Sequence, residues 1–379
     1  MKEESVFDFA GARIVLVGPL PPPSGGMANQ TKQLKGLLSE EGAEVTLVST
    51  NAPYRPALMG RIPGVRAFFR LVPYRARLRS AARGATLFHV MANSGWAWHF
   101  FAAPALRAAH RAGVAAVLNY RGGDAERFLA RSFPVVEKSL RTAAAVVVPS
   151  DFLRGVFARH GVATDVVPNI VDLERFRPRS ASSNGGGLVR RSLGEGGPRL
   201  LIARHLEPIY DVETGLRAFQ ILRQRYPTAV LDVAGSGPDR ERLERLSGEL
   251  GLERSVRFLG QVENETMPSL YQSADIALNP SLVDNMPISL LEALASGVPV
   301  VSTSSGGIPA MVKAGEEAIL VSPRDPDAMA NAVVALWESP ESRSALREAG
   351  LRRASAFAWS SVREEWRRVY ERATSSASK

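Results

Sequence analysis

Short runs of apolar residues alternate with longer amphipathic stretches along most of the chain, which predicts β-strands separated by α-helices. The runs are almost continuously apolar, as is typical of strands buried on both faces of a parallel sheet. They form two series, so we expect two doubly wound, Rossmann-like units of the α/β class. The first series is Arg13–Val17, Glu44–Val48, Thr86–Val90, Ala115–Asn119, Ala145–Pro149 and Thr164–Val167; the second is Arg199–Ala203, Ala229–Ala234, Val256–Leu259, Ile276–Asn279, Val298–Ser302 and Ala318–Val321.

A segment rich in serine and glycine separates the two series. It runs from Ser180 to Pro198 and has the composition of a linker or loop. We therefore place the first unit at residues 1–178, the linker at 179–198 and the second unit at 199–358. Within the first unit we expect a helix over Pro134–Ala143, because a first helical turn tolerates proline. Ligands of such sheets bind at the carboxyl ends of the strands, so we expect a cleft between two facing units.

The composition excludes several classes of protein. The chain has 379 residues, 45% of them hydrophobic, and no cysteine, so disulfide scaffolds and thiolate chemistry are excluded. Its five histidines form no HExxH-like pair, which leaves a zinc hydrolase without ligands. No apolar run reaches the ~18 residues that a membrane-spanning helix needs, and Met1–Phe9 is acidic, unlike a signal peptide. We expect a soluble, cytoplasmic protein.

The positive charge is concentrated in one segment. The formal net charge is +9, and eight arginines between Ala52 and Gly84, with no acidic residue among them, contribute +8 of it. Because apolar residues such as Phe69 and Leu71 lie between these arginines, segment 55–83 suits peripheral contact with an anionic membrane or a polyanionic ligand. A solvated helical face explains the same pattern. Nucleic acid is not expected as a partner, since no DNA- or RNA-binding motif accompanies the charge.

Two carboxylates flank the N-terminus of a predicted helix in the second unit. The segment Asp284-Asn-Met-Pro-Ile-Ser-Leu-Leu-Glu292 has a proline suited to a first helical turn, and Gly297 follows as a C-cap. Asp284 would precede the helix and Glu292 would lie within it. The free N–H groups of such a helix N-terminus can hold an anion or sugar oxygens. An acidic N-cap followed by a solvent-facing glutamate is the alternative interpretation.

Adjacent glycines follow the first predicted strand. In Gly18-Pro-Leu-Pro-Pro-Pro-Ser24-Gly25-Gly26 they precede a predicted helix, and they let the backbone approach a phosphate or a sugar closely. An ordinary turn is the alternative. The pattern is not GxGxxG, which argues against a nicotinamide-dependent enzyme.

Several of these motifs resemble the retaining glycosyltransferases of family 4, which have the two-Rossmann architecture called GT-B. The most specific is the pair of carboxylates eight residues apart, followed by Ala293-Leu-Ala-Ser-Gly-Val-Pro-Val-Val. The helix that begins near Trp359 looks like the family's last helix, which returns to the first domain. The resemblance therefore implies that residues 359–379 belong to the first unit. Three further segments resemble the family's interdomain run, its glycine turn and the strand that meets the nucleotide base: Val167–Asp172 with Arg175-Phe176, Leu231–Pro238 and Val256–Gly260.

The resemblance implies a role for individual residues. Glu292 takes the place of the carboxylate that binds the donor ribose, and Asp284 that of a glutamate facing the donor-sugar hydroxyls. Arg204 matches the arginine that clamps the donor diphosphate, as suits a guanidinium fork beside a leaving phosphate. The family's lysine a few residues later is absent, and Tyr210 or Arg121 would replace it. Arg121 stands where the family often has histidine, and since arginine cannot act as a base we expect it to bind phosphate or acceptor.

These considerations give a set of candidate site residues. Arg204, Asp284 and Arg121 are the predicted catalytic residues, and no metal ligand is predicted. Contacts to the donor nucleotide are expected from Glu292, Gly25, Gly26, Gly235, Gln261, Asn285, Met286, Pro287, Ile288 and Tyr210.

The resemblance predicts a retaining glycosyltransferase that moves a sugar from a nucleoside-diphosphate sugar, UDP-linked, to a hydroxyl of a glycan, a lipid-linked acceptor or a small molecule. In the family's usual mechanism the leaving diphosphate takes the acceptor proton, so no protein base, metal or cofactor is expected. Two alternatives stay open. A sugar-nucleotide 2-epimerase shares the architecture, and a non-catalytic sugar-nucleotide-binding protein would explain the missing lysine and the shorter side chain of Asp284.

Overall fold

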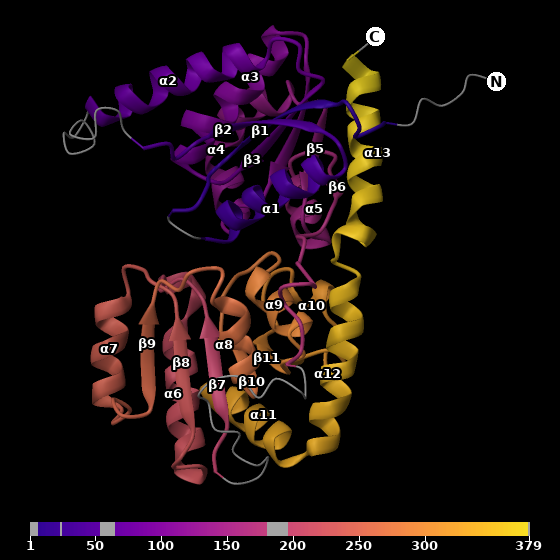
Figure 1. Cartoon of the computed structure of the whole chain (residues 1–379). Helices are drawn as coiled ribbons and strands as arrows, with labels where there is room; N and C mark the ends of the chain where they lie inside the picture. Colours follow the sequence, from indigo (N-terminus) through magenta and orange to yellow (C-terminus); the bar gives the residue numbers. More distant parts are fainter. Residues whose placement is uncertain (1–6, 23–24, 54–64, 180–195, 378–379) are drawn as a thin grey trace. The chain divides into compact units, whose positions relative to one another are not determined.

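The computed structural model describes residues 7–22, 25–53, 65–179 and 196–377, and the chain folds into two compact units (Figure 1). Unit 1 is Met1–Asn169 together with Val362–Lys379, and unit 2 is Ile170–Ser361. Most of the predicted linker, residues 180–195, and the first part of the basic segment, residues 54–64, lie outside the described residues.

The sheet of unit 1 is parallel at every described strand pair. Its six strands lie in the order β2-β1-β3-β4-β5-β6. The two central strands, β3 and β4, are buried along their whole length, which explains why their sequences are apolar apart from His89 and Asn119. The strands are β1 (Arg13–Gly18), β2 (Glu44–Ser49), β3 (Leu87–Ala92), β4 (Ala115–Tyr120), β5 (Ala145–Val148) and β6 (Asp165–Val166).

Helices connect these strands, and several of them form an apolar core with the sheet. The core includes Val90 and Leu118 from the sheet, Leu78 and Leu106 from the helices, and the fully buried ring of Trp98. The helices are α1 (Gly26–Glu40), α2 (Val65–Ala81), the π-helix η2 (Trp98–Ala102), α3 (Ala103–Arg111), α4 (Ala125–Leu140), α5 (Asp151–Ala158) and α13 (Trp359–Ala377).

The predicted helix over Pro134–Ala143 was wrong in its start. The helix is α4, which begins at Ala125, so Pro134 lies in its interior rather than in its first turn. A proline removes one hydrogen bond from a helix interior. The apolar face of α4, with Phe128, Leu129 and Val136, is buried against the core. This packing holds the helix together across the proline.

The sheet of unit 2 is also parallel, and its six described strands lie in the order β12-β11-β10-β7-β8-β9. The chain runs outward from β7 to β9 on one side and then returns to β10 on the other. The order therefore reverses between β7 and β10. The strands are β7 (Arg199–Ala203), β8 (Val230–Ala234), β9 (Val256–Gly260), β10 (Ile276–Asn279), β11 (Val300–Thr303) and β12 (Ile319–Val321).

Helices surround this sheet too. Phe219 and Leu222 pack with Leu231 in one apolar cluster, and Leu290, Leu294 and their neighbours form a second. The helices are the 3₁₀ turn η3 (Pro208–Tyr210), α6 (Val212–Arg225), α7 (Arg240–Glu249), α8 (Met267–Ser273), α9 (Ile288–Ala295), α10 (Ile308–Met311), α11 (Pro326–Glu338) and α12 (Pro340–Ser355).

The division between the units differs from the predicted boundary at residue 178. Residues 170–178 pack with unit 2, because Val171 and Phe176 lie in the same apolar cluster as Leu290. The N–H of Val171 also donates to the carbonyl oxygen of Phe357 at 2.9 Å. Helix α13 follows unit 2 in the sequence, but its residues from Val362 onward belong to unit 1.

Candidate functional site

The point of strand-order reversal in unit 2 brings two sequence-predicted residues together. Arg204 directly follows β7, and the loop between β10 and α9 carries Asp284. Because β7 and β10 are parallel neighbours, their carboxyl ends open at the same edge of the sheet. In doubly wound sheets ligands bind at this place. Residues 80 positions apart in the sequence therefore meet where the fold provides a site.

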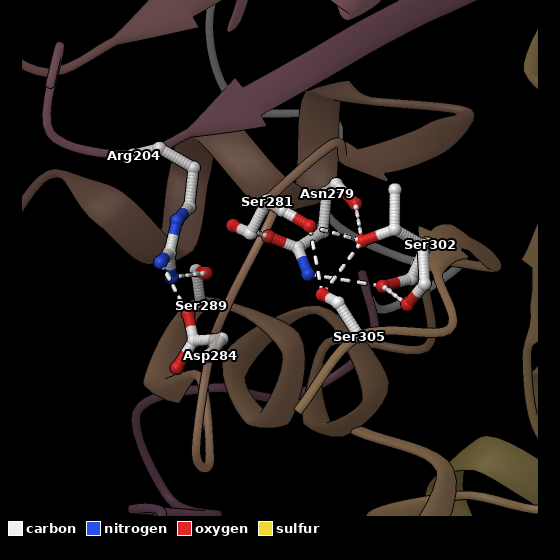
Figure 2. Close-up of polar contacts among 8 residues, drawn as sticks. Arg204, Asn279, Ser281, Asp284, Ser289, Ser302 and Ser305 are labelled. Carbon is white, nitrogen blue, oxygen red and sulfur yellow. Dashed lines mark hydrogen bonds and ion pairs between the residues drawn. The ribbon is translucent and has the colours of Figure 1, made fainter. Parts of the chain in front are cut away.

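The guanidinium of Arg204 is held from three sides. It forms an ion pair with Asp284, and the two side chains are only 10% and 13% exposed. Its Nη1 donates to the hydroxyl of Ser289 on α9 at 3.3 Å (Figure 2). Its Cζ lies 4.0 Å from the centre of the Tyr210 ring, a cation–π contact. Within the described residues its buried Nε has no hydrogen-bond partner.

Tyr210 lies in the turn that the family resemblance associates with a lysine. It ends the 3₁₀ turn η3, and the next residue, Asp211, has a positive φ of 43°. Burial raises the pKa of Tyr210, and the charge of Arg204 opposes that shift. The phenol is therefore neutral at physiological pH, and its ring supports the guanidinium.

Glu292 lies on α9, on the same helix as Ser289. Its Oε2 accepts a hydrogen bond from the hydroxyl of Tyr271 at 3.1 Å, and this hydroxyl is also 3.0 Å from the carbonyl oxygen of Ser289. Burial raises the pKa of Glu292 to about 7, although the Tyr271 hydroxyl and the charge of Arg175 both act to lower it. A carboxyl with this pKa is half ionised near neutrality and gains from a ligand that donates hydrogen bonds to it.

The residues between the two carboxylates serve mainly to hold the loop and start the helix. Pro287 is the N-cap of α9, which begins at Ile288, so Glu292 lies just over one turn into the helix. Asn285 and Met286 are 4% and 6% exposed, and Met286 belongs to the apolar cluster around Leu290. The side chain of Met286 is thus a packing group.

A buried polar cluster that the sequence analysis did not identify fixes the loop of Asp284. It joins the ends of β10 and β11 through Asn279, Ser281, Ser302, Thr303 and Ser305, whose side chains are at most 5% exposed (Figure 2). Asn279 donates to the Ser302 hydroxyl and accepts from that of Ser281, both at 2.9 Å, and Ser305 donates to the carbonyl oxygen of Ser281 at 2.7 Å. The sequence feature that could have predicted this cluster is the presence of small polar residues at the ends of neighbouring strands.

Three glycines contact the backbone of the site closely. The N–H of Gly307 donates to the carbonyl oxygen of Asp284 at 2.7 Å, and a Cβ on Gly306 would come within 2.1 Å of the same oxygen. A Cβ on Gly235, which follows β8, would come within 1.8 Å of the carbonyl oxygen of Arg204. These glycines therefore position Arg204 and Asp284 through the backbone. Gln261, which follows β9, is exposed at the same edge of the sheet.

Arg121, the predicted catalytic residue of unit 1, belongs to a buried polar network of that unit. Arg121 follows β4, and its Nε and Nη1 donate to the amide oxygens of Asn119 and Asn169. Asn119 in turn donates to Nε2 of the fully buried His89 at 2.9 Å, and Nδ1 of His89 lies 2.7 Å from the hydroxyl of Tyr370 on α13. Burial, with the charge of Arg121, lowers the pKa of His89 to about 3, so this imidazole is neutral.

Arg121 carries a charge that its surroundings do not compensate. Burial lowers its pKa to about 9, and no carboxylate of the described residues forms an ion pair with it.

Gly25 and Gly26 lie elsewhere in unit 1, where Gly25 is the extended N-cap of α1. Across the described ranges, no group of three or more His, Asp or Glu side chains comes together as a metal site would require. Nor does any helix in those ranges have the length and hydropathy to cross a membrane.

Two family models match, and together they span most of the chain. "Glycosyltransferase Family 4" matches residues 24–175, and "Glycosyl transferases group 1" matches residues 190–353. The chain therefore belongs to the glycosyltransferases of family 4 type, with the GT-B architecture that the two sheets define.

Two curated relatives match part of the chain in sequence. The D-inositol 3-phosphate glycosyltransferases of Corynebacterium urealyticum and Corynebacterium jeikeium are 32% and 34% identical to it over 220 and 218 residues. The matches cover 56% and 55% of this chain and 51% and 52% of the relatives. The chain thus spans about half the length of the curated relatives it matches.

Solved structures show the same fold over nearly the whole chain. Anabaena Alr3699/HepE in complex with UDP has a TM-score of 0.71 and 18% identity, covering 93% of this chain and 98% of that one. Sucrose-phosphate synthase from Thermosynechococcus elongatus has a TM-score of 0.73 and 20% identity, covering 96% and 100%. At these identities the likeness shows the fold alone.

Proposed function

We propose that this chain transfers a glycosyl group from a UDP-linked sugar to an acceptor hydroxyl with retention of the anomeric configuration. The observation that carries the proposal is Arg204, a shielded guanidinium at the point of strand-order reversal, beside a helix that bears Glu292. Membership of a glycosyltransferase family supports it. The choice of UDP is supported by the Anabaena neighbour, whose structures contain UDP and UDP-glucose.

In the proposed reaction the acceptor oxygen forms a bond to the anomeric carbon on the face from which the diphosphate leaves. The bond between that carbon and the β-phosphate oxygen breaks, and the acceptor proton passes to the departing phosphate. Negative charge grows on the diphosphate as the bond breaks. Arg204 stabilises this charge through its fork, which is already oriented by its neighbours.

Asp284 has two roles in this proposal. Without donor it pairs with Arg204 and compensates a charge that would otherwise be shielded and alone. With donor bound, the diphosphate replaces Asp284 as the ion-pair partner of Arg204. The Asp284 carboxylate can then accept hydrogen bonds from the sugar hydroxyls. The backbone contacts to Gly307 keep the loop in place during this exchange.

The proposal is tested by incubating the purified chain with UDP-, GDP- and ADP-sugars and measuring nucleotide release with and without glycan, lipid-linked and small-molecule acceptors. Acceptor-dependent UDP release with an α-linked product from an α-linked donor would support it. A 2-epimer formed without acceptor, or tight UDP binding with no turnover on any acceptor, would contradict it. The same assay in EDTA tests the further proposal that Arg204 acts without a metal.

Glu292 makes donor binding depend on pH. We expect the donor dissociation constant to rise about tenfold between pH 8 and pH 6, because ribose hydroxyls donate to the ionised carboxyl, which has a pKa of about 7. Glu292→Gln should weaken binding by about tenfold at pH 8, since a hydrogen bond to a charged group contributes ~1.5–3 kcal/mol. Calorimetry with UDP at several pH values measures both effects, and a variant with the parent's pH profile would contradict the assignment.

The same group has a predictable effect on stability. Because the pKa of Glu292 in the folded chain is raised from 4.5 to about 7, its contribution to the free energy of unfolding is full below pH 4.5 and is lost as the pH rises past 7. Without ligand, Glu292→Gln should therefore melt higher than the parent at pH 8, with a smaller difference at pH 5. Weaker UDP binding with higher stability is a combination that loss of fold cannot produce.

We further propose that Arg121 binds an oxyanion of a substrate. A shielded guanidinium held by two neutral amide oxygens has no counter-charge of its own among the described residues. Arg121→Gln should raise the KM of the substrate it binds by about tenfold, the typical effect of one charge-assisted contact. Arg121→Lys should recover part of the loss, because it restores the charge without the fork. Equal KM values for the two variants would assign Arg121 a structural role.

A further inference from the structure

A groove in unit 1 is lined by four arginines. It lies between α2 and α3, which pack side by side (Figure 1), and has a volume of about 480 Å³. Arg75 and Arg79 line it from α2, and Arg107 and Arg111 line it from α3. We call this the α2–α3 groove. The two arginines of α3 lie outside the basic segment that the sequence analysis singled out.

The spacing of the arginines along the two helices makes them converge. In each pair the residues are four positions apart, so both side chains of a pair lie on one face of their helix. All four are exposed, and none forms an ion pair with a carboxylate of the described part of the chain. Like charges at this spacing destabilise a helix. The folded chain therefore gains nothing from this arrangement by itself, and an anion in the groove would relieve it.

The floor of the groove is apolar. Leu78 is 1% exposed and Ala82 is 6% exposed, and Pro104 from α3 completes the floor. The floor is firmly held, because the hydroxyl of Tyr74 on α2 donates to the carbonyl oxygen of Phe101 in η2 at 2.8 Å. A ligand that fits must present an anionic group to the rim and a hydrocarbon surface to the floor.

Exposed apolar side chains accompany the same elements. Trp96, just before η2, is 74% exposed and stacks on Phe100, which is 39% exposed, with ring centres 5.3 Å apart. Val72 on α2 is 49% exposed. Val72 is three positions before Arg75, so the two lie on the same face of α2. Exposed apolar side chains beside arginines are typical of surfaces that bind the headgroup region of a bilayer.

The groove lies away from the candidate site of its own unit. Helices α2 and α3 end where they lead into the starts of β3 and β4, so Arg79 and Arg111 are near the edge of the sheet where the parallel strands begin. Arg121 follows the end of β4, at the opposite edge. An occupant of the groove would leave that opposite edge open.

We propose that the α2–α3 groove binds the phosphate groups of anionic phospholipids and holds the chain on a membrane surface. Guanidinium forks match phosphate oxygens, and the apolar floor accepts the first methylene groups of the lipid. The arginine side chains supply the attraction, so binding falls as salt is raised. This inference does not depend on the proposed transfer reaction.

The test is co-sedimentation of the full chain with vesicles of phosphatidylcholine alone or mixed with phosphatidylglycerol. The chain should bind the mixed vesicles at low salt and not the neutral ones. The variant Arg75→Gln/Arg79→Gln/Arg107→Gln/Arg111→Gln should bind them about 100-fold more weakly or worse, since one arginine near an anionic surface changes the binding constant roughly fivefold. Its melting curve shows whether it is folded.

The matched control removes four exposed arginines of unit 2: Arg245→Gln/Arg254→Gln/Arg347→Gln/Arg352→Gln. It lowers the net charge equally and should bind mixed vesicles within about threefold of the parent. An equal loss of binding in both variants would show that only net charge matters, and it would contradict the proposal that the groove is the binding site. If the parent chain did not bind mixed vesicles, the proposal of membrane binding would be wrong. A groove-dependent rise in melting temperature with inorganic phosphate, without vesicle binding, would assign the groove to a soluble phosphate.

Discussion

Replacing Arg204 by alanine is expected to lower kcat by about 100-fold or more, with a smaller effect on the KM of the donor. The reason is that additional negative charge develops on the leaving β-phosphate oxygen as its bond to the sugar breaks, and an oriented guanidinium stabilises this charge most in the transition state. Arg204→Lys should restore only part of the rate, because an ammonium group cannot bind two phosphate oxygens as the fork does. Steady-state kinetics with the donor and acceptor found in the activity screen measure both variants.

A control is needed because Arg204→Ala also leaves the shielded carboxylate of Asp284 without its partner. Arg204→Met/Asp284→Asn removes both charges and should recover stability without recovering kcat. Arg242→Ala breaks the two ion pairs that this exposed arginine of unit 2 forms with Glu213 and Asp239, and it should leave kcat unchanged. If Arg204→Lys were as active as the parent, the diphosphate would have to be stabilised elsewhere.

Gly235→Ala is expected to destabilise unit 2 by about 3 kcal/mol or more, a size typical of strained backbone and overpacking combined. Its Cβ would lie 1.8 Å from the carbonyl oxygen of Arg204, and its φ of 153° is one that residues with a side chain rarely adopt. Relief of this clash must move the backbone that carries Arg204, so donor affinity should fall as well. Urea unfolding followed by circular dichroism measures the first effect and UDP titration the second.

Gly248→Ala serves as the matched control for this substitution. Gly248 lies within α7 at an ordinary helical φ, and a Cβ there would meet only Glu253, at 3.4 Å. Alanine should therefore be neutral or raise the free energy of unfolding by up to ~1 kcal/mol. If Gly235→Ala behaved like this control, the close approach to Arg204 would not constrain the site.

The two sheets could be predicted because a strand that is buried on both faces has an almost continuous run of apolar residues, which is visible in the sequence. Runs such as Arg199–Ala203 became strands at the expected positions, since a strand at the centre of a parallel sheet has no polar face. The start of α4 could not be predicted in the same way. Pro134 is a strong local signal for a helix start, but the buried face of α4 outweighs it.

The candidate site was predicted residue by residue and assembled only by the fold. Asp284 and Glu292 belong to one motif, and Arg204 was predicted because it matches the arginine that clamps the donor diphosphate in the family. That Arg204 pairs with Asp284 and contacts Ser289 follows from the order of the strands, which no short segment encodes. Gly235 was expected to contact the donor, whereas its position reveals a backbone constraint on Arg204.

The sequence by itself determined the α/β class and the two series of strands, because burial periodicity is a local property, and its motifs supplied the candidate residues of the site through their resemblance to a family. Tertiary structure decided everything that depends on neighbours distant in the chain. It shields Glu292 so that its pKa rises to about 7, it closes the polar cluster around Asn279, and it brings the arginines of α2 and α3 to one groove. A desolvation energy, a hydrogen-bond network and a convergent set of charges exist only once the chain has brought those groups together.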